Sequence, residues 1–156
     1  MKEVSIRSVL VGTWDVKGVP KGQPRPRAFV RGTRAAVYDP GTAEGWKGDV
    51  ARACAELEGR CLIAPLSVRL SFYLPRPKSH FRSNRQLKES SPVWLHAGKP
   101  DVDNLAKAVL DALTGIRAWR DDAQVCEMQV SRHYECPAKM STGCLISISE
   151  LMEVEA

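Results

Sequence analysis

Alternating apolar and polar positions predict the strands of this chain. Between residues 67 and 74 the even positions are apolar, and the odd positions are Ser, Arg, Ser and Tyr. A period of two is typical of a strand with one buried face. Residues 4–11 are rich in β-branched side chains and predict an earlier strand, and residues 125–134 and 144–151 predict two more near the C-terminus.

Apolar residues at helical spacing predict two helices. The first helix carries four of them, three or four positions apart: Trp46, Val50, Cys54 and Leu57. We expect Thr42 to be its N-cap and Gly59 to end it. The second helix is expected over residues 102–113, with Asp101 as its N-cap. No internal repeat is present, so residues 1–156 fit a single domain.

Two stretches rich in proline and basic residues interrupt these elements. Residues 17–27 read KGVPKGQPRPR, a composition that excludes a helix or a central strand. We expect a loop there, followed by a short hairpin through residues 29 and 37–38. Residues 75–100 predict a second loop of about 25 residues, a length that compact domains keep when the loop is disordered or functional.

The net charge of +5 is concentrated in these stretches. Residues 17–34 hold six Lys or Arg and no acid, and residues 76–88 hold five and no acid. Two basic tracts on either side of an acidic centre suit the binding of a polyanion near a metal site. Charge alone is equally compatible with solvated loops.

The cysteine pattern and the N-terminal residues indicate a cytoplasmic protein. Five cysteines make an odd number, and no Cys-x-x-Cys pair is present, which favours reduced thiols over a disulfide framework. Residues 1–11 include Lys2, Glu3 and Arg7 and contain no apolar core of a signal peptide. No apolar run approaches the length of a membrane span.

Acidic residues gather at the start of the second helix and before the strand at residue 125. Helical geometry places four polar residues on one arc: Asp103, Asn104, Lys107 and Asp111. Asp121 and Asp122 precede a strand, so the chain can return beside the start of the helix. Converging carboxylates repel one another unless a cation neutralises them, and oxygen ligands without nearby His or Cys favour Mg²⁺ or Mn²⁺.

A structural explanation of the same acids stays open. Acidic residues in a first helical turn are stabilised by the helix dipole, and Asp103 with Lys107 has the spacing of an ordinary ion pair. We assign Asp111 to a structural ion pair of this kind.

The residues of this region resemble the RusA-type Holliday-junction resolvases. The string KPDVDNLxKxVxDALxG at residues 99–115, followed by DDAQV at 121–125, carries the resemblance, and PKGQPRPR at 20–27 is similar to that family's N-terminal basic loop. The resemblance implies an α+β fold, a mixed sheet with two main helices packed on it. It also implies a homodimer that binds four-way DNA junctions and nicks two opposed strands.

The resemblance also implies roles for particular residues. By motif, Asp101, Asp103 and Asp122 would bind the metal, Lys107 would be the catalytic lysine and Asn104 an active-site neighbour, with Asp121 in support. The implied reaction is Mg²⁺-dependent hydrolysis of a phosphodiester, with one or two ions and with Mn²⁺ as a substitute. The chain departs from the family in its longer loop over residues 76–98 and in Arg132, where many relatives carry lysine.

Contacts to the DNA backbone would come from the two basic tracts. The candidates are Lys21, Arg25, Arg27, Arg76, Lys78, Arg82 and Arg85. Such contacts position DNA without reading its sequence. Two other functions remain open: a metal-dependent nuclease that acts on other branched or single-stranded DNA, and a DNA-binding module without catalysis, in which the acids only cap a helix.

Overall fold

One mixed sheet organises the part of the chain described by the computed structural model, which comprises residues 2–38, 41–136 and 139–155. Its strand order is β1-β6-β4-β5, with β4 and β5 parallel and the other neighbours antiparallel. The strands of the sheet are β1 (Val4–Lys17), β4 (Leu66–Leu74), β5 (Val125–Tyr134) and β6 (Gly143–Glu155). A separate hairpin consists of β2 (Arg27–Arg31) and β3 (Arg34–Tyr38), as the sequence predicted.

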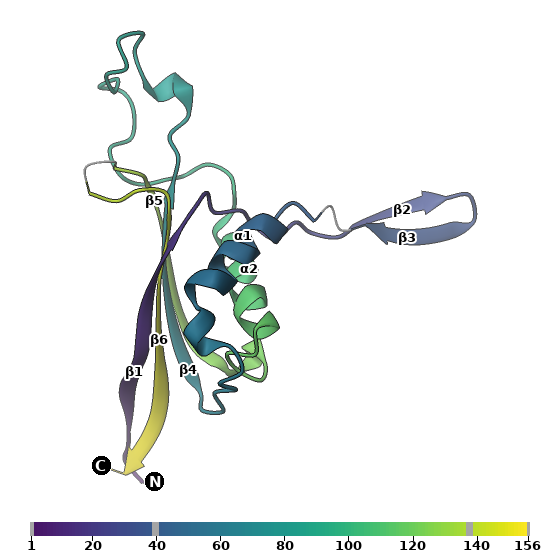
Figure 1. The fold of residues 1–156 in the computed structure, drawn as a ribbon, viewed down its shortest axis with the longest axis vertical. Helices are drawn as coiled ribbons and strands as arrows, with labels where there is room; N and C mark the ends of the chain where they lie inside the picture. Colours follow the sequence, from purple (N-terminus) through teal and green to yellow (C-terminus); the bar gives the residue numbers. More distant parts are fainter. Residues whose placement is uncertain (1, 39–40, 137–138, 156) are drawn as a thin grey trace.

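Two helices lie on one face of the sheet, α1 (Glu44–Ala53) and α2 (Val102–Gly115) (Figure 1). Three single turns of 3₁₀ helix complete the fold: η1 (Ala55–Leu57), η2 (Lys78–His80) and η3 (Asp122–Gln124). The expected α+β fold, a mixed sheet with two main helices packed on it, is confirmed. Among the described residues, no helix combines the length and the apolar character needed to cross a membrane.

The core lies between the helices and the alternate side chains of the strands. Leu70 and Phe72 of β4 and Ile146 of β6 are fully buried there, and Trp46 of α1 lies against them in the same cluster, as its spacing predicted. The opposite face carries small polar side chains, and Ser71 of β4 is within hydrogen-bonding distance of the hydroxyl of its β5 neighbour. All five cysteines are free, in agreement with the expected reduced thiols.

Both basic segments leave the sheet at the end where α2 begins. Lys17 ends β1 at this end, and the loop that follows leads to the β2–β3 hairpin, which projects away from the body (Figure 1). The loop that follows β4 also projects from this end and returns to the edge of β5. There Tyr134 donates its backbone N–H to the carbonyl of Trp94 at 2.8 Å, and His96 donates to the carbonyl of Arg132 at 3.3 Å.

The predicted bounds of the first helix were wrong at both ends. Ala43, not Thr42, is the N-cap, and its methyl side chain cannot cap the helix. The N–H of Glu44 instead donates to the carbonyl of Gly41 at 3.3 Å. The helix ends at Ala53 and does not continue to Gly59. The 3₁₀ turn η1 follows, and it still buries Leu57, so the apolar spacing continues beyond the helix itself.

The outer strands are longer than the pattern predicted. The predicted β1 ended at residue 11, but the strand continues to Lys17 past a shift in register between Leu10 and Gly12. This irregularity breaks the alternation and turns Trp14 and Val16 toward the core. β6 likewise extends to Glu155, because it pairs with β1 beyond the start of β4.

Gly143, the first residue of β6, is required by close backbone contact. A Cβ at this position would lie 2.0 Å from the carbonyl oxygen of Val16, and its φ is +153°. We expect Gly143→Ala to lower the free energy of unfolding by about 2 kcal/mol or more. The matched control is Gly115→Ala at the end of α2, where a Cβ would meet nothing within 4 Å. Urea unfolding followed by circular dichroism checks both, and equal midpoints for the two variants would contradict the assignment.

Candidate active site

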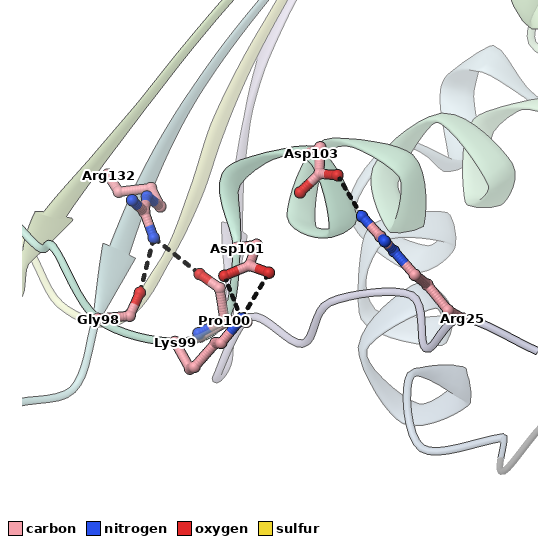
Figure 2. Close-up of polar contacts among 7 residues, drawn as sticks. All are labelled: Arg25, Gly98, Lys99, Pro100, Asp101, Asp103 and Arg132. Atoms are coloured by element: carbon pink, nitrogen blue, oxygen red, sulfur yellow. Dashed lines mark hydrogen bonds and ion pairs between the residues drawn. The ribbon is translucent and has the colours of Figure 1, made fainter. Parts of the chain in front are cut away.

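Asp101 stands at the N-cap position of α2 but does not cap the helix. Its backbone is extended, with φ −70° and ψ 149°, and its side chain makes no capping hydrogen bond. Both carboxylate oxygens instead accept hydrogen bonds from the Lys99 ammonium, each at 2.7 Å (Figure 2). An aspartate at this position ordinarily accepts from the N–H groups of the first turn. The carboxylate of Asp101 is therefore paired with an exposed lysine and remains available to a ligand.

The charge of Asp101 is maintained by its surroundings. The hydrogen bond from Lys99 lowers the pKa of this carboxyl most, and the charges of Lys99, Arg132 and Arg25 lower it further. Desolvation acts in the opposite direction but is outweighed. The group is thus an anion at neutral pH, as a ligand for a hard cation must be.

Asp103 lies in the first turn of α2 and faces the basic loop. Its Oδ2 is 3.3 Å from Nη2 of Arg25 (Figure 2), and both side chains are largely exposed. The loop reaches this turn by backbone contact, because Gln23 donates its N–H to the carbonyl of Asn104 at 2.8 Å. A Cβ on Gly22 would lie 3.0 Å from Cβ of Asn104, so the absence of a side chain at Gly22 permits this approach.

Arg132 of β5 holds the segment that leads into Asp101. Its Nη1 donates to the carbonyl oxygens of Gly98 and Pro100, at 2.8 Å each (Figure 2). In register, Arg132 is the neighbour of the buried Phe72, so it extends from the helix-covered face of the sheet. The sequence identified this residue only as a departure from the family pattern. A signal for its role was available, because an arginine at a core-facing strand position needs polar partners.

Lys107 lies one turn after Asp103 on the same helix. Its Nζ is 3.2 Å from Oδ1 of Asp111, so the structure pairs it with the later acid and not with Asp103. The structural ion pair predicted for Asp111 is therefore present. The ammonium of Lys107 stays largely exposed and can also reach a bound anion.

Asp121 and Asp122 have different positions in η3. The Asp121 side chain accepts from the N–H of Ala123 at 2.8 Å, and the Gln124 side chain accepts in return from the N–H of Asp121 at 3.1 Å. Gln124 also donates to the carbonyls of Leu62 and Ala64, which fixes η3 beside the segment that leads into β4. Asp121 is thus a supporting residue of the turn, whereas Asp122 is exposed and takes no part in this cap.

The structure does not bring Asp122 to Asp101 and Asp103 within one chain. Asp122 precedes Val125, the first residue of β5, and Asp101 follows the carbonyl that Arg132 holds. At about 3.3 Å per residue, the strand rises about 23 Å from Val125 to Arg132. Among the described residues, no group of three or more His, Cys, Asp or Glu is arranged to hold a metal ion. The expected convergence fails because α2 runs antiparallel to β5, so the start of the helix lies where the strand ends.

The structure places the basic candidates differently, and Arg25 is the one that pairs with Asp103. Lys21 and Lys99 line a groove of about 360 Å³ beside Pro100. Arg76 is engaged inside its own loop, where its guanidinium donates to the carbonyls of Pro92 and Val93 and lies 4.8 Å from the centre of the Tyr134 ring. Lys78, Arg82 and Arg85 are exposed in the same loop. Arg27 begins β2, and its side chain lies outside the described part of the structure.

The acids at the start of α2 fit a divalent cation. Each pairs with one cationic side chain that is mostly exposed, 83% for Lys99 and 78% for Arg25, so an ion can displace both. Mg²⁺ in phosphate chemistry is commonly held by one or two carboxylates together with waters and phosphate oxygens. Asp101 and Asp103 supply that minimum.

Comparison with known proteins identifies the family. The family model described as "Endodeoxyribonuclease RusA" matches residues 17–141, which include every candidate described above. The chain is 34% identical over 121 residues to the "Uncharacterized protein YqaN" of Bacillus subtilis (strain 168), over 76% of this chain and 84% of that protein. Members of the family are nucleases that act on Holliday junctions and generally depend on divalent metal ions. The chain described here belongs to the RusA endodeoxyribonuclease family.

Proposed function

We propose that this protein is a Mg²⁺-dependent endonuclease that resolves four-way DNA junctions by paired, symmetric nicks. The observation that carries the proposal is the carboxylate of Asp101, which stands at a helix N-cap without capping it and lies beside Asp103 and the basic loop. In a DNA-binding module without catalysis, the side chains of these acids would only cap the helix. The side chain of Asp101 makes no capping hydrogen bond. The cationic side chains around it outnumber the acids, which favours the binding of a phosphate.

Asp101 and Asp103 would hold the metal ion. Bound there, Mg²⁺ withdraws charge from a phosphate oxygen and makes a water molecule more acidic. The chain's own residues do the rest. Arg132 fixes the backbone that orients Asp101, and Lys107 places a positive charge one turn along the helix, where it stabilises the charge that develops on the phosphate.

The basic segments would bind the DNA backbone on either side of this site. Lys21 and Lys99 line the groove next to the acids. The loop after β4, which holds further exposed cations, projects from the same end of the domain (Figure 1). A four-way junction has approximate two-fold symmetry, so a homodimer would present one site to each of two matching strands. The products would be paired nicks that leave 5′ phosphates.

We expect Asp101→Asn and Asp103→Asn to lower cleavage of a synthetic four-way junction by about 100-fold or more, because the metal loses an anionic ligand. Junction binding should stay equal or tighten, since a negative charge facing phosphate is removed. The control is Asp49→Asn, which changes an acid of α1 that pairs with Arg52. Cleavage is measured with Mg²⁺ on the junction, a flap and a plain duplex. Near-normal cleavage by both variants would refute the site, and preference for the flap would refute the substrate.

We expect junction affinity to fall steeply with salt, because bound cations release counterions from DNA. The combined change of Lys21, Arg82 and Arg85 to Ala should reduce the slope of log affinity against log salt by about one unit per residue. The matched control changes Lys2, Arg7 and Arg69 to Ala, which lie at the other end of β1 or on the face of the sheet without helices. Fluorescence anisotropy without Mg²⁺ measures both slopes, and equal slopes would exclude these residues from the DNA surface.

A further inference from the structure

We propose that the loop after β4 binds an unstacked base at the branch point of the DNA, through the ring of Phe81 and the cations around it. Phe81 directly follows η2 in the loop that projects from the domain (Figure 1). This inference rests on the proposed function, because it assigns to one side chain the preference for a branched substrate over a plain duplex.

The residues after Phe81 form a tight turn. Arg82 donates its N–H to the carbonyl of Gln86 at 2.8 Å, and Arg85 donates to the carbonyl of Arg82 at 2.9 Å. Phe81 and Leu87 are antiparallel bridge partners on either side of this turn. The backbone at Phe81 is therefore held by contacts within the loop itself.

Aromatic rings attach the base of the same loop to the sheet. The centre of the Trp94 ring lies 4.6 Å from that of His133 and 5.9 Å from that of Tyr73. The His80 ring meets the Tyr134 ring edge-on, with 5.0 Å between the centres. His80 directly precedes Phe81, so the segment that carries Phe81 is attached to β5. A ligand of Phe81 would thus meet a loop that is already in place, which lowers the entropic cost of binding.

A hollow of about 450 Å³ lies beside Phe81, and it is lined by one aromatic ring and three cationic side chains: Lys78, Phe81, Arg82 and Arg85. Phe81 is 37% exposed, and its ring stacks on no other aromatic ring of the described residues. Within the described part of the chain, Lys78 and Arg85 form no ion pair, and Arg82 reaches only the exposed Glu89, at 3.8 Å. The hollow therefore combines a partly exposed aromatic ring with positive charge that the protein hardly neutralises.

A nucleobase with its flanking phosphates is complementary to this hollow. Proteins that bind unpaired strands stack the bases on aromatic rings and place basic side chains along the phosphates. In a continuous duplex, each base is stacked on both sides, so Phe81 would find no free base face. At a branch point the stack is interrupted, and the ring of Phe81 can replace the missing neighbour.

The position of the loop relates this contact to the acids at the start of α2. The loop leaves the sheet after Leu74, projects from the end of the domain at which α2 begins, and returns to Asp101 (Figure 1). A junction whose centre meets Phe81 would thus lie at the same end of the domain as the candidate active site. The cations beside Phe81 bind any phosphate, whereas stacking on Phe81 would favour DNA with an interrupted stack.

Substitutions of Phe81 separate stacking from packing. We expect Phe81→Leu, which keeps apolar bulk but has no aromatic face, to weaken binding of a four-way junction by about 10-fold and to leave binding of a plain duplex unchanged. Phe81→Tyr keeps the ring and should bind both as the wild type does. The matched control is Val93→Ala, an exposed apolar residue of the same loop outside the hollow, and it should change neither affinity. Fluorescence anisotropy without Mg²⁺ at fixed salt measures all four proteins.

Removal of bases from the DNA tests the partner of Phe81. Junctions made abasic at the branch point, in symmetric pairs of positions, should include one whose affinity Phe81→Leu no longer lowers, because the stacking partner is missing. The inference is overturned if Phe81→Leu binds the junction as tightly as the wild type, if it weakens junction and duplex equally, if Val93→Ala has the same effect, or if the effect persists on every abasic junction. Each of these results leaves Mg²⁺-dependent cleavage at Asp101 and Asp103 intact. A wild type that binds the duplex as tightly as the junction would instead refute the substrate of the proposed function together with this inference.

Discussion

The candidate site depends on the hydrogen bonds from Arg132 to the carbonyls of Gly98 and Pro100. Through these two hydrogen bonds of 2.8 Å, the end of β5 fixes the backbone that enters α2. The long loop reaches this point after its hydrogen bonds to the edge of β5 at Trp94 and His96. The acids that follow belong to its last residues and to the first turn of the helix. A guanidinium suits this task because it donates from several N–H groups in a fixed plane. A lysine at this position could supply the charge but not the same planar set of donors.

Around this anchor, the fold places a small anionic site inside a cationic surface. The backbone of the basic loop packs on the first turn of α2 through Gly22, which brings Arg25 to Asp103. The ammonium of Lys99 pairs with the carboxylate of Asp101. The balance of charge favours phosphate, and the two carboxylates favour a hard cation beside it. Under the proposed function, binding of DNA and binding of metal would be coupled in one place, because each would neutralise charge that the other leaves.

Much of the fold could be predicted from the sequence, since alternation over residues 67–74 and helical spacing after Pro100 report burial directly. The motif also indicated which acids to examine. The errors came from features that are not local. A register shift near Gly12 interrupts the alternation, so the second half of β1 was not predicted. A 3₁₀ turn continues the apolar spacing past the end of α1, so that helix was predicted too long. The order of the elements along the chain suggested that Asp122 lies near Asp101. That order does not reveal that α2 runs antiparallel to β5.

The central claim is that the carboxylates at the start of α2 bind a divalent cation. An anomalous difference map from a crystal of the wild-type protein soaked with Mn²⁺ tests it most directly. The account predicts a peak within coordination distance of oxygens from Asp101 and Asp103, with the ammonium of Lys99 displaced. A map in which Mn²⁺ binds only elsewhere, while Lys99 keeps its two hydrogen bonds to Asp101, would contradict it.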